Sequence, residues 1–249
     1  MQALLLRKEG SIIQNTEYKM AKLLAILQKF LNEVESNNPY KLILKGGTAL
    51  ALYYFNHHRE SEDLDFDADL CQKPNHKEIQ KYFVDILQKL KNDKIIQDFR
   101  IKKHGFAATE RYHIKIELET YKIYETKIDI DFVDAPKKIE KINQLYLYPA
   151  ERIFITKMIT FCSRKEFKDL FDLSYLITKI DLKTFAGNKN VILLIDELIA
   201  ILENENLKEL YKQAFRNVDL MFKNLKESQV EAFTVKLARD LKILRNKLR

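Results

Sequence analysis

The sequence has few of the residues that build long connections, and it lacks the features of secreted or membrane proteins. Only five glycines and four prolines occur among 249 residues, so the connections between elements must be short. Cys71 and Cys162 lie far apart without CxxC spacing, which excludes a zinc framework and favours a reduced protein. The longest apolar run, at 49–55, is too short to cross a membrane, and the apolar patch at 3–6 is too short for a signal peptide. We therefore expect a cytoplasmic protein with no membrane segment.

Hydrophobic and basic residues are abundant. A hydrophobic content of 46%, with 11% aromatic residues, is ample for a packed core. The net charge of +7 and the isoelectric point near 9.1 favour a polyanionic partner such as nucleic acid. A lysine-rich chain can also be basic because of the amino-acid usage of its source, so charge alone does not decide the partner.

The hydrophobic pattern changes near Pro149. Before this residue strand-like and helix-like segments alternate, whereas only helical periodicity follows it. The first part predicts helices at 12–35, 48–55 and 77–91, and strands at 41–45, 64–68, 97–103, 112–120 and 125–133. The second part predicts helices at 150–162, 165–178, 189–204, 207–226 and 229–247. We therefore expect an α+β protein, with a mixed β-sheet core flanked by helices at 1–148 and an all-helical C-terminal domain at 149–249.

A double glycine follows the first predicted strand. In the segment Lys45-Gly46-Gly47-Thr48, the two glycines precede a predicted helix and can present bare backbone N–H groups to a phosphate. The alternative is a plain turn from strand to helix. The acidic residues downstream favour the phosphate interpretation.

The next predicted strand carries alternating acidic residues. In an extended segment Asp63, Asp65, Asp67 and Asp69 project to one face. Neighbouring carboxylates on that face are about 6.6 Å apart at the backbone, close enough for their tips to converge on one or two divalent ions. The alternative is an edge strand with one solvated acidic face, and this could be the whole role of Asp67 and Asp69.

A second acidic strand contains Asp129 and Asp131, again on one face. One of them could complete a triad with Asp63 and Asp65, either as a general base or as a further metal ligand. Taken alone, this segment is explained equally well by an ordinary half-exposed strand.

These segments together resemble a known family. Residues 45–50 (KGGTAL), followed by 59–66 (RESEDLDF), are similar to the signature of the AbiEii/AbiGii toxin family, within the polymerase-β-like nucleotidyltransferase superfamily. The segment at 128–130 (IDI) resembles the strand that bears the superfamily's third carboxylate, and 151–157 with 164–173 resemble the helical segment that follows. The resemblance covers residues 40–180, and the remaining C-terminal helices carry no recognised motif.

The resemblance implies an enzyme that has the nucleotidyltransferase fold and nucleotidyltransferase activity. Such an enzyme transfers a nucleoside monophosphate from an NTP to an acceptor with Mg²⁺ or Mn²⁺, and some similar proteins modify the 3′ end of tRNA. It also implies the toxin of a type IV toxin–antitoxin pair, whose antitoxin need not bind it. The implied catalytic and metal-binding residues are Asp63, Asp65 and Asp129. Glycines common near Asp131 in the related strand are absent here, which leaves Asp131 as an alternative to Asp129.

The resemblance also implies a nucleotide-binding set. Its members are Lys45, Gly46, Gly47, Thr48, Arg59, Ser61, Lys157, Lys168 and Asp169. Arg59 would neutralise phosphate charge, or else pair with Glu62 or Asp63. Ser61 would bond a phosphate, or else cap the approach to the strand.

Lys157 lies in an otherwise apolar helical turn, where a cation is costly unless it meets an anion. Its alternative is a lysine that snorkels to solvent. Arg164, Lys168 and Asp172 recur at helical spacing and could form a salt-bridge stripe on one face of a helix.

Two other classes of function remain open. One is a metal-dependent nuclease, because clustered carboxylates and lysines also suit phosphodiester hydrolysis. The other is a non-catalytic RNA-binding or regulatory protein on the same scaffold. The basic residues of the final helix could grip RNA, or they could form a solvated surface.

Overall fold

The computed structural model describes residues 22–72, 75–105, 109–119, 122–134, 138–142, 145–204 and 227–249. The chain divides into two compact units, Met1–Tyr148 and Pro149–Arg249, and each is described by itself. The helix predicted at 207–226, the start of the helix predicted at 12–35 and the apolar patch at 3–6 lie outside the described residues. Within the described part of the chain, no helix is long and apolar enough to cross a bilayer.

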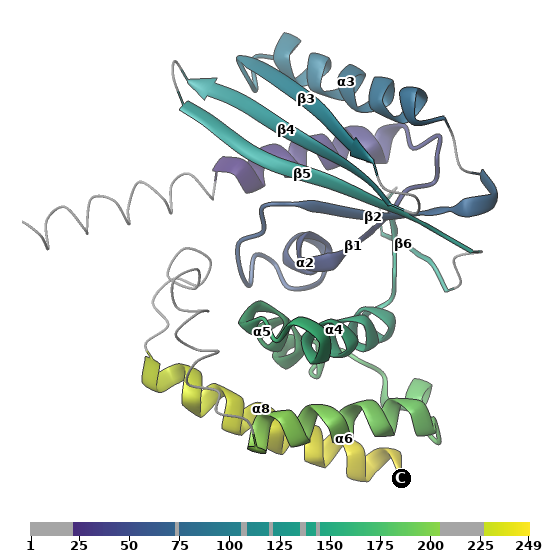
Figure 1. The fold of residues 1–249 in the computed structure, drawn as a ribbon, viewed down its shortest axis with the longest axis vertical. Helices are drawn as coiled ribbons and strands as arrows, with labels where there is room; N and C mark the ends of the chain where they lie inside the picture. The colour runs from purple at the N-terminus through teal and green to yellow at the C-terminus, as the bar shows by residue number, and fades with distance from the viewer. Residues whose placement is uncertain are drawn as a thin grey trace, which may run out of the picture. The chain divides into compact units, whose positions relative to one another are not determined.

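The first unit is built on a mixed sheet of seven described strands (Figure 1). The strands are β1 (Ile43–Lys45), β2 (Leu64–Asp69), β3 (Asp98–Gly105), β4 (Thr109–Glu119), β5 (Lys122–Val133), β6 (Glu140–Ile142) and β7 (Leu145–Leu147). Their order is β3-β4-β5-β2-β1-β7-β6. β2 lies between β5, which runs parallel to it, and β1, which runs antiparallel. The interpretation of β2 as an edge strand is therefore wrong.

Two helices cover one face of this sheet (Figure 1). They are the helix at 22–36 and α3 (His76–Asn92), whose start is capped by a reciprocal pair of hydrogen bonds between Asn75 and Glu78. Alternate residues of β4, including Tyr112, Ile114 and Ile116, are buried in the same core cluster as the helices. Because side chains alternate across a strand, the residues between them lie on the opposite, polar face.

The double glycine begins a short helical segment. α2 (Gly46–Ala49) starts directly after β1 and continues as a π-helical turn at Leu50–Tyr54. Gly46 has a φ of 73°, in the left-handed region that glycine adopts without steric cost. The helix therefore starts two residues earlier than predicted from the hydrophobic pattern.

The sequence pattern did not predict β6 and β7. Each has only three residues, too few for a periodic signal, although the burial of Leu145 and Leu147 alternates with that of Tyr146. β7 pairs in parallel with β1, so the sheet continues on the side of β1 that is opposite to β2.

In the second unit the described elements are all helical, and the predicted α+β class is confirmed. The elements are α4 (Ala150–Arg164), α5 (Phe167–Leu176), a 3₁₀ turn at Leu182–Phe185, α6 (Lys189–Asn204) and α8 (Glu227–Leu248). Lys165 has a left-handed conformation (φ 52°) and separates α4 from α5. Arg164 therefore belongs to α4, and the prediction that it forms a stripe with Lys168 and Asp172 on one helix is wrong.

Candidate functional site

The glycine turn lies against two of the predicted site residues. A Cβ atom added to Gly46 would be 2.3 Å from Oδ2 of Asp65, and one added to Gly47 would be 2.1 Å from Nη2 of Arg59. Only glycine can occupy either position without moving one of these charged groups. The glycine turn is therefore packed directly against the carboxylate of Asp65 and the guanidinium of the buried Arg59.

Hydroxyl groups join this turn to the start of β2. Oγ1 of Thr48 is 2.7 Å from Oγ of Ser61 and also donates a short hydrogen bond to the backbone carbonyl of Asp63. Thr48 is fully buried and Ser61 is nearly so. The side chains of Thr48 and Ser61 therefore position the turn and Asp63, and their hydroxyl groups are used within the protein.

The strand register arranges the acidic residues in two rows on the polar face. Asp65 lies directly opposite Asp129, and Asp67 lies directly opposite Asp131. The parallel pairing of β2 and β5 thus brings together the two acidic segments that are more than sixty residues apart in the sequence. Asp63 comes just before β2 rather than within it.

Lys45 neutralises the row that contains Asp67 and Asp131. Its Nζ atom makes a short ion pair with Asp67 and donates a 2.6 Å hydrogen bond to Asp131. Asp67 also accepts a 2.6 Å hydrogen bond from Tyr148, and Asp131 accepts one of 2.6 Å from Thr109. Asp67 is therefore a buried structural acid, and the interpretation of it as a solvated residue is wrong.

The ionisation of this row follows from these contacts. Burial lowers the pKa of Lys45, but the negative charge of Asp67 and the hydrogen bond to Asp131 outweigh burial and leave that pKa above its ordinary value. Burial raises the pKa of Asp131, but the hydrogen bonds from Lys45 and Thr109 leave it below its ordinary value. The ionised forms of Lys45 and Asp131 are thus stabilised by their contact with each other.

The row that contains Asp65 and Asp129, together with Asp63 just before β2, meets two other cations. The guanidinium of Arg111 donates hydrogen bonds of 2.7 Å to both oxygens of Asp129. Nζ of Lys127 is 2.8 Å from Oδ2 of Asp63. The hydrogen bond to Asp129, together with the charges of Asp63 and Asp65, raises the pKa of Arg111 above its ordinary value. All three predicted catalytic carboxylates therefore act on one guanidinium.

The donor atoms at this position suit a hard divalent cation, because all three predicted ligands are carboxylates on adjacent segments. Among the described residues, no three His, Cys, Asp or Glu side chains are already grouped as a metal site. Asp129 and Asp63 instead face Arg111 and Lys127. Ligand chemistry thus fits Mg²⁺ or Mn²⁺, provided that these two carboxylates exchange their partners.

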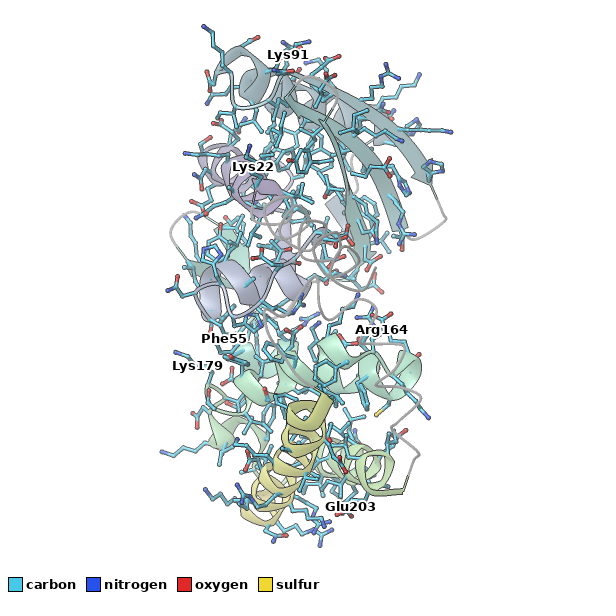
Figure 2. The ribbon with its side chains drawn as sticks, turned by 90° about the vertical axis from the view of Figure 1, so that its left-hand side faces the viewer. Lys22, Phe55, Lys91, Arg164, Lys179 and Glu203 are labelled. Atoms are coloured by element: carbon cyan, nitrogen blue, oxygen red, sulfur yellow. The ribbon has the colours of Figure 1, made fainter. Side chains whose placement is uncertain are left out.

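The predicted site residues of the second unit form their own buried network. Lys157 pairs with Asp169 at 2.9 Å and with Asp172 at 2.7 Å, and its side chain is 8% exposed. Arg164, labelled in Figure 2, donates two further hydrogen bonds to Asp169. Lys157 therefore does not snorkel to solvent, and its burial is compensated by two carboxylates. Lys168 instead pairs with Glu166 at the surface.

Burial raises the pKa of Asp169, but the charge of Lys157 and the hydrogen bonds from Arg164 more than offset it. The pKa of this carboxyl is therefore below its ordinary value. The ion pairs of Lys157 and Arg164 with Asp169 thus hold α4 and α5 together.

The basic residues of the final helix are largely paired with acidic ones. Lys236 pairs with Asp240 on α8 itself, and Lys242 pairs with Glu203 of α6. Arg245 and Arg249 both reach Asp196. These pairs favour a surface and packing role for α8 over the alternative of an RNA grip.

Two residues of the site, Arg111 and Lys127, were missed from the sequence. Both occupy polar positions of alternating strands, and this pattern is visible in the sequence. Only the register shows that Arg111 lies opposite Asp129. Such a pairing has no signal in the spacing along one chain.

Comparison with known proteins gives both a family and a fold. The family model of the nucleotidyl transferase AbiEii toxin, type IV toxin–antitoxin system, matches residues 29–242. No curated protein matches the chain. A solved structure of a candidate nucleotidyltransferase from H. pylori is similar, with 20% identity, a TM-score of 0.66, and coverage of 92% of this chain and 96% of that one. JHP933 from Helicobacter pylori is also similar, with 21% identity, a TM-score of 0.64 and 93% coverage of both chains.

Proposed function

The chain belongs to the AbiEii family of nucleotidyl transferase toxins of type IV toxin–antitoxin systems, and we propose that it transfers a nucleoside monophosphate from an NTP to an acceptor at the carboxylate site of unit 1. One observation carries this proposal: Asp65 lies between the glycine turn and Asp129. A turn that can approach phosphates thus adjoins carboxylates that can hold a cation beside them.

We propose that Asp63, Asp65 and Asp129 hold Mg²⁺ or Mn²⁺. A divalent ion bound there would polarise the α-phosphate and stabilise the attacking and leaving oxygens. Asp129 is preferred to Asp131 as the third ligand, because Asp131 is held by both Lys45 and Thr109. Asp129 is also the direct neighbour of Asp65 across the strand pair.

Backbone N–H groups of Gly46 and Gly47 would contact the triphosphate, and Arg59, packed against Gly47, would neutralise part of its charge. Lys45, Thr48 and Ser61 would act by holding this turn in place. A role for Lys157, Lys168 and Asp169 toward the nucleotide remains a proposal that rests on the family resemblance. We also propose that the units 1–148 and 149–249 are separate domains.

We propose RNA, such as the 3′ end of a tRNA, as the acceptor. The polar face of β3 and β4 supports this, because paired positions on the two strands are basic and side chains with nitrogen tips project from the sheet on the side away from the helices (Figure 2). The basic paired positions are Arg100 with Lys115, Lys102 with His113, and His104 with Arg111. Arg111 connects this basic face directly to Asp129, so an RNA backbone bound along the face would end near the carboxylates.

Incubation of the protein with each labelled NTP, Mg²⁺ or Mn²⁺ and total cellular RNA tests the reaction. We expect label to enter RNA with the wild-type protein and not with Asp65→Asn. Release of RNA fragments without NTP consumption would indicate the nuclease. Nucleotide or RNA binding without turnover would indicate the non-catalytic alternative.

A charge-reversal pair tests the basic face. Arg100→Glu with Lys102→Glu should weaken RNA binding and flatten its salt dependence, because released counterions contribute to the affinity. The matched control is Lys77→Glu with Lys81→Glu, at exposed positions of α3. Equal loss in both double variants would refute a specific role of this face.

Expression in bacteria tests the toxin role. We expect the induced wild-type protein to act in the cytoplasm, where NTPs and RNA occur, and to slow growth. The Asp63→Asn variant should be harmless. A protein encoded beside it should restore growth, with or without forming a complex. Growth unaffected by a protein that is active in vitro would refute the toxin role alone.

A further inference from the structure

The two rows of carboxylates differ in how firmly their cations are held. The side chain of Lys45 is 23% exposed, whereas those of Arg111 and Lys127 are 38% and 41% exposed. The partners of Lys45, Asp67 and Asp131, are 6% and 41% exposed, and Asp129 and Asp63, the partners of Arg111 and Lys127, are 18% and 33% exposed. An ion pair this open to solvent costs less to break than a buried one, although the two-pronged contact of Arg111 with Asp129 holds more firmly than a single surface contact. The cations of the second row can therefore leave without repacking the core.

Arg111 occupies both oxygens of the carboxylate that the proposed reaction needs. Its Nε and Nη2 atoms each donate a 2.7 Å hydrogen bond to Asp129. Asp65 is the partner of Asp129 across the strands, so these two carboxylates repel each other unless a cation lies near them. A guanidinium on β4, opposite Asp129 in the antiparallel register, supplies that positive charge from within the chain.

We propose that Arg111 is a built-in counter-ion of the carboxylate site. It holds Asp129 in the metal-free protein, and it releases Asp129 when a divalent cation binds. This inference rests on the proposed metal site. It assigns to Arg111 a positioning role that sets how tightly the site binds metal, because the guanidinium and the metal ion compete for the same oxygens.

The test is a titration of the metal-free protein with Mn²⁺ alone. Calorimetry measures the affinity for Mn²⁺, and the shift of the unfolding temperature measures the stabilisation by bound Mn²⁺. Arg111→Gln should bind Mn²⁺ about tenfold more tightly than the wild type, the change expected for removing a competing charged hydrogen-bond donor. Without metal, the variant should unfold at a lower temperature than the wild type. Saturating Mn²⁺ should raise the unfolding temperature of the variant by more than it raises that of the wild type. Arg111→Lys keeps the charge but not the two-pronged contact, so its affinity for Mn²⁺ should lie between that of the wild type and that of Arg111→Gln.

Lys91→Gln is the matched control. Lys91 pairs at 2.8 Å with Asp98, which is not a proposed ligand, and its side chain is 40% exposed, close to the 38% of Arg111. Its substitution should leave Mn²⁺ affinity unchanged. Unchanged or weaker affinity in Arg111→Gln, or an equal increase in Lys91→Gln, would overturn the inference.

Asp129→Asn separates the inference from the function on which it rests. Loss of Mn²⁺ binding in Asp129→Asn together with unchanged binding in Arg111→Gln would refute the counter-ion role and leave the metal site standing. Wild-type Mn²⁺ affinity in Asp129→Asn would refute the metal site, and the inference would fall with it.

Discussion

Gly46→Ala should inactivate the protein by moving one carboxylate. The added Cβ would lie 2.3 Å from Oδ2 of Asp65, whereas ordinary contacts begin at 3.4 Å. Asp65 must therefore move by about 1 Å, a displacement that can lower the rate of a positioned reaction by about 100-fold. The φ of 73° adds backbone strain of about 1–2 kcal/mol for a residue with a side chain.

Gly187→Ala isolates the backbone effect. Gly187 has a φ of 70°, but a Cβ there would meet nothing within 4 Å. We expect Gly187→Ala to lose about 1–2 kcal/mol of the free energy of unfolding, measured by urea denaturation, and Gly46→Ala to lose at least as much because of its added contact with Asp65. Only Gly46→Ala should also lose nucleotide transfer, measured as label incorporated into RNA. Near-normal transfer by folded Gly46→Ala would show that the position of Asp65 does not matter for the reaction, and the site assignment would be refuted.

Three further predictions follow from the charged networks. Asp129→Asn should reduce transfer more than Asp131→Asn at saturating metal, and the reverse order would move the third ligand two residues along β5. Lys45→Met should lower the free energy of unfolding in urea by about 3 kcal/mol because it leaves a buried carboxylate without its cation, and the added change Asp67→Asn should recover part of that loss; an additive loss would refute the coupling. Because its folded-state pKa is lowered, Asp169 stabilises the fold fully above its unfolded pKa of about 3.9 and loses that contribution as the pH falls through the folded value, so Asp169→Asn should flatten the acid side of the stability curve, and an unchanged slope would contradict this.

Local chemistry explains why much of the chain could be predicted from its sequence. The alternation of Ile128, Asp129 and Ile130 reports a strand with one buried face, because successive side chains point to opposite sides. The two glycines indicate a turn in which the backbone can adopt conformations that other residues avoid. The resemblance of the segment around them to a family motif indicated the nucleotidyltransferase fold. The family and the α+β class were therefore available from residues close together in the chain.

Partners distant in the sequence were decided only by the tertiary structure. The apolar surroundings of Lys157 in the sequence indicated that it needs an anion, and only the fold shows that Asp169 and Asp172 of the next helix supply one. Likewise, the parallel register of β2 and β5 sets Asp65 opposite Asp129, and the antiparallel register of β4 sets Arg111 against it. A shift of one residue would send each of these side chains to the other face. Spacing along the sequence determines which side chains alternate, whereas only strand pairing and helix packing determine which charges meet.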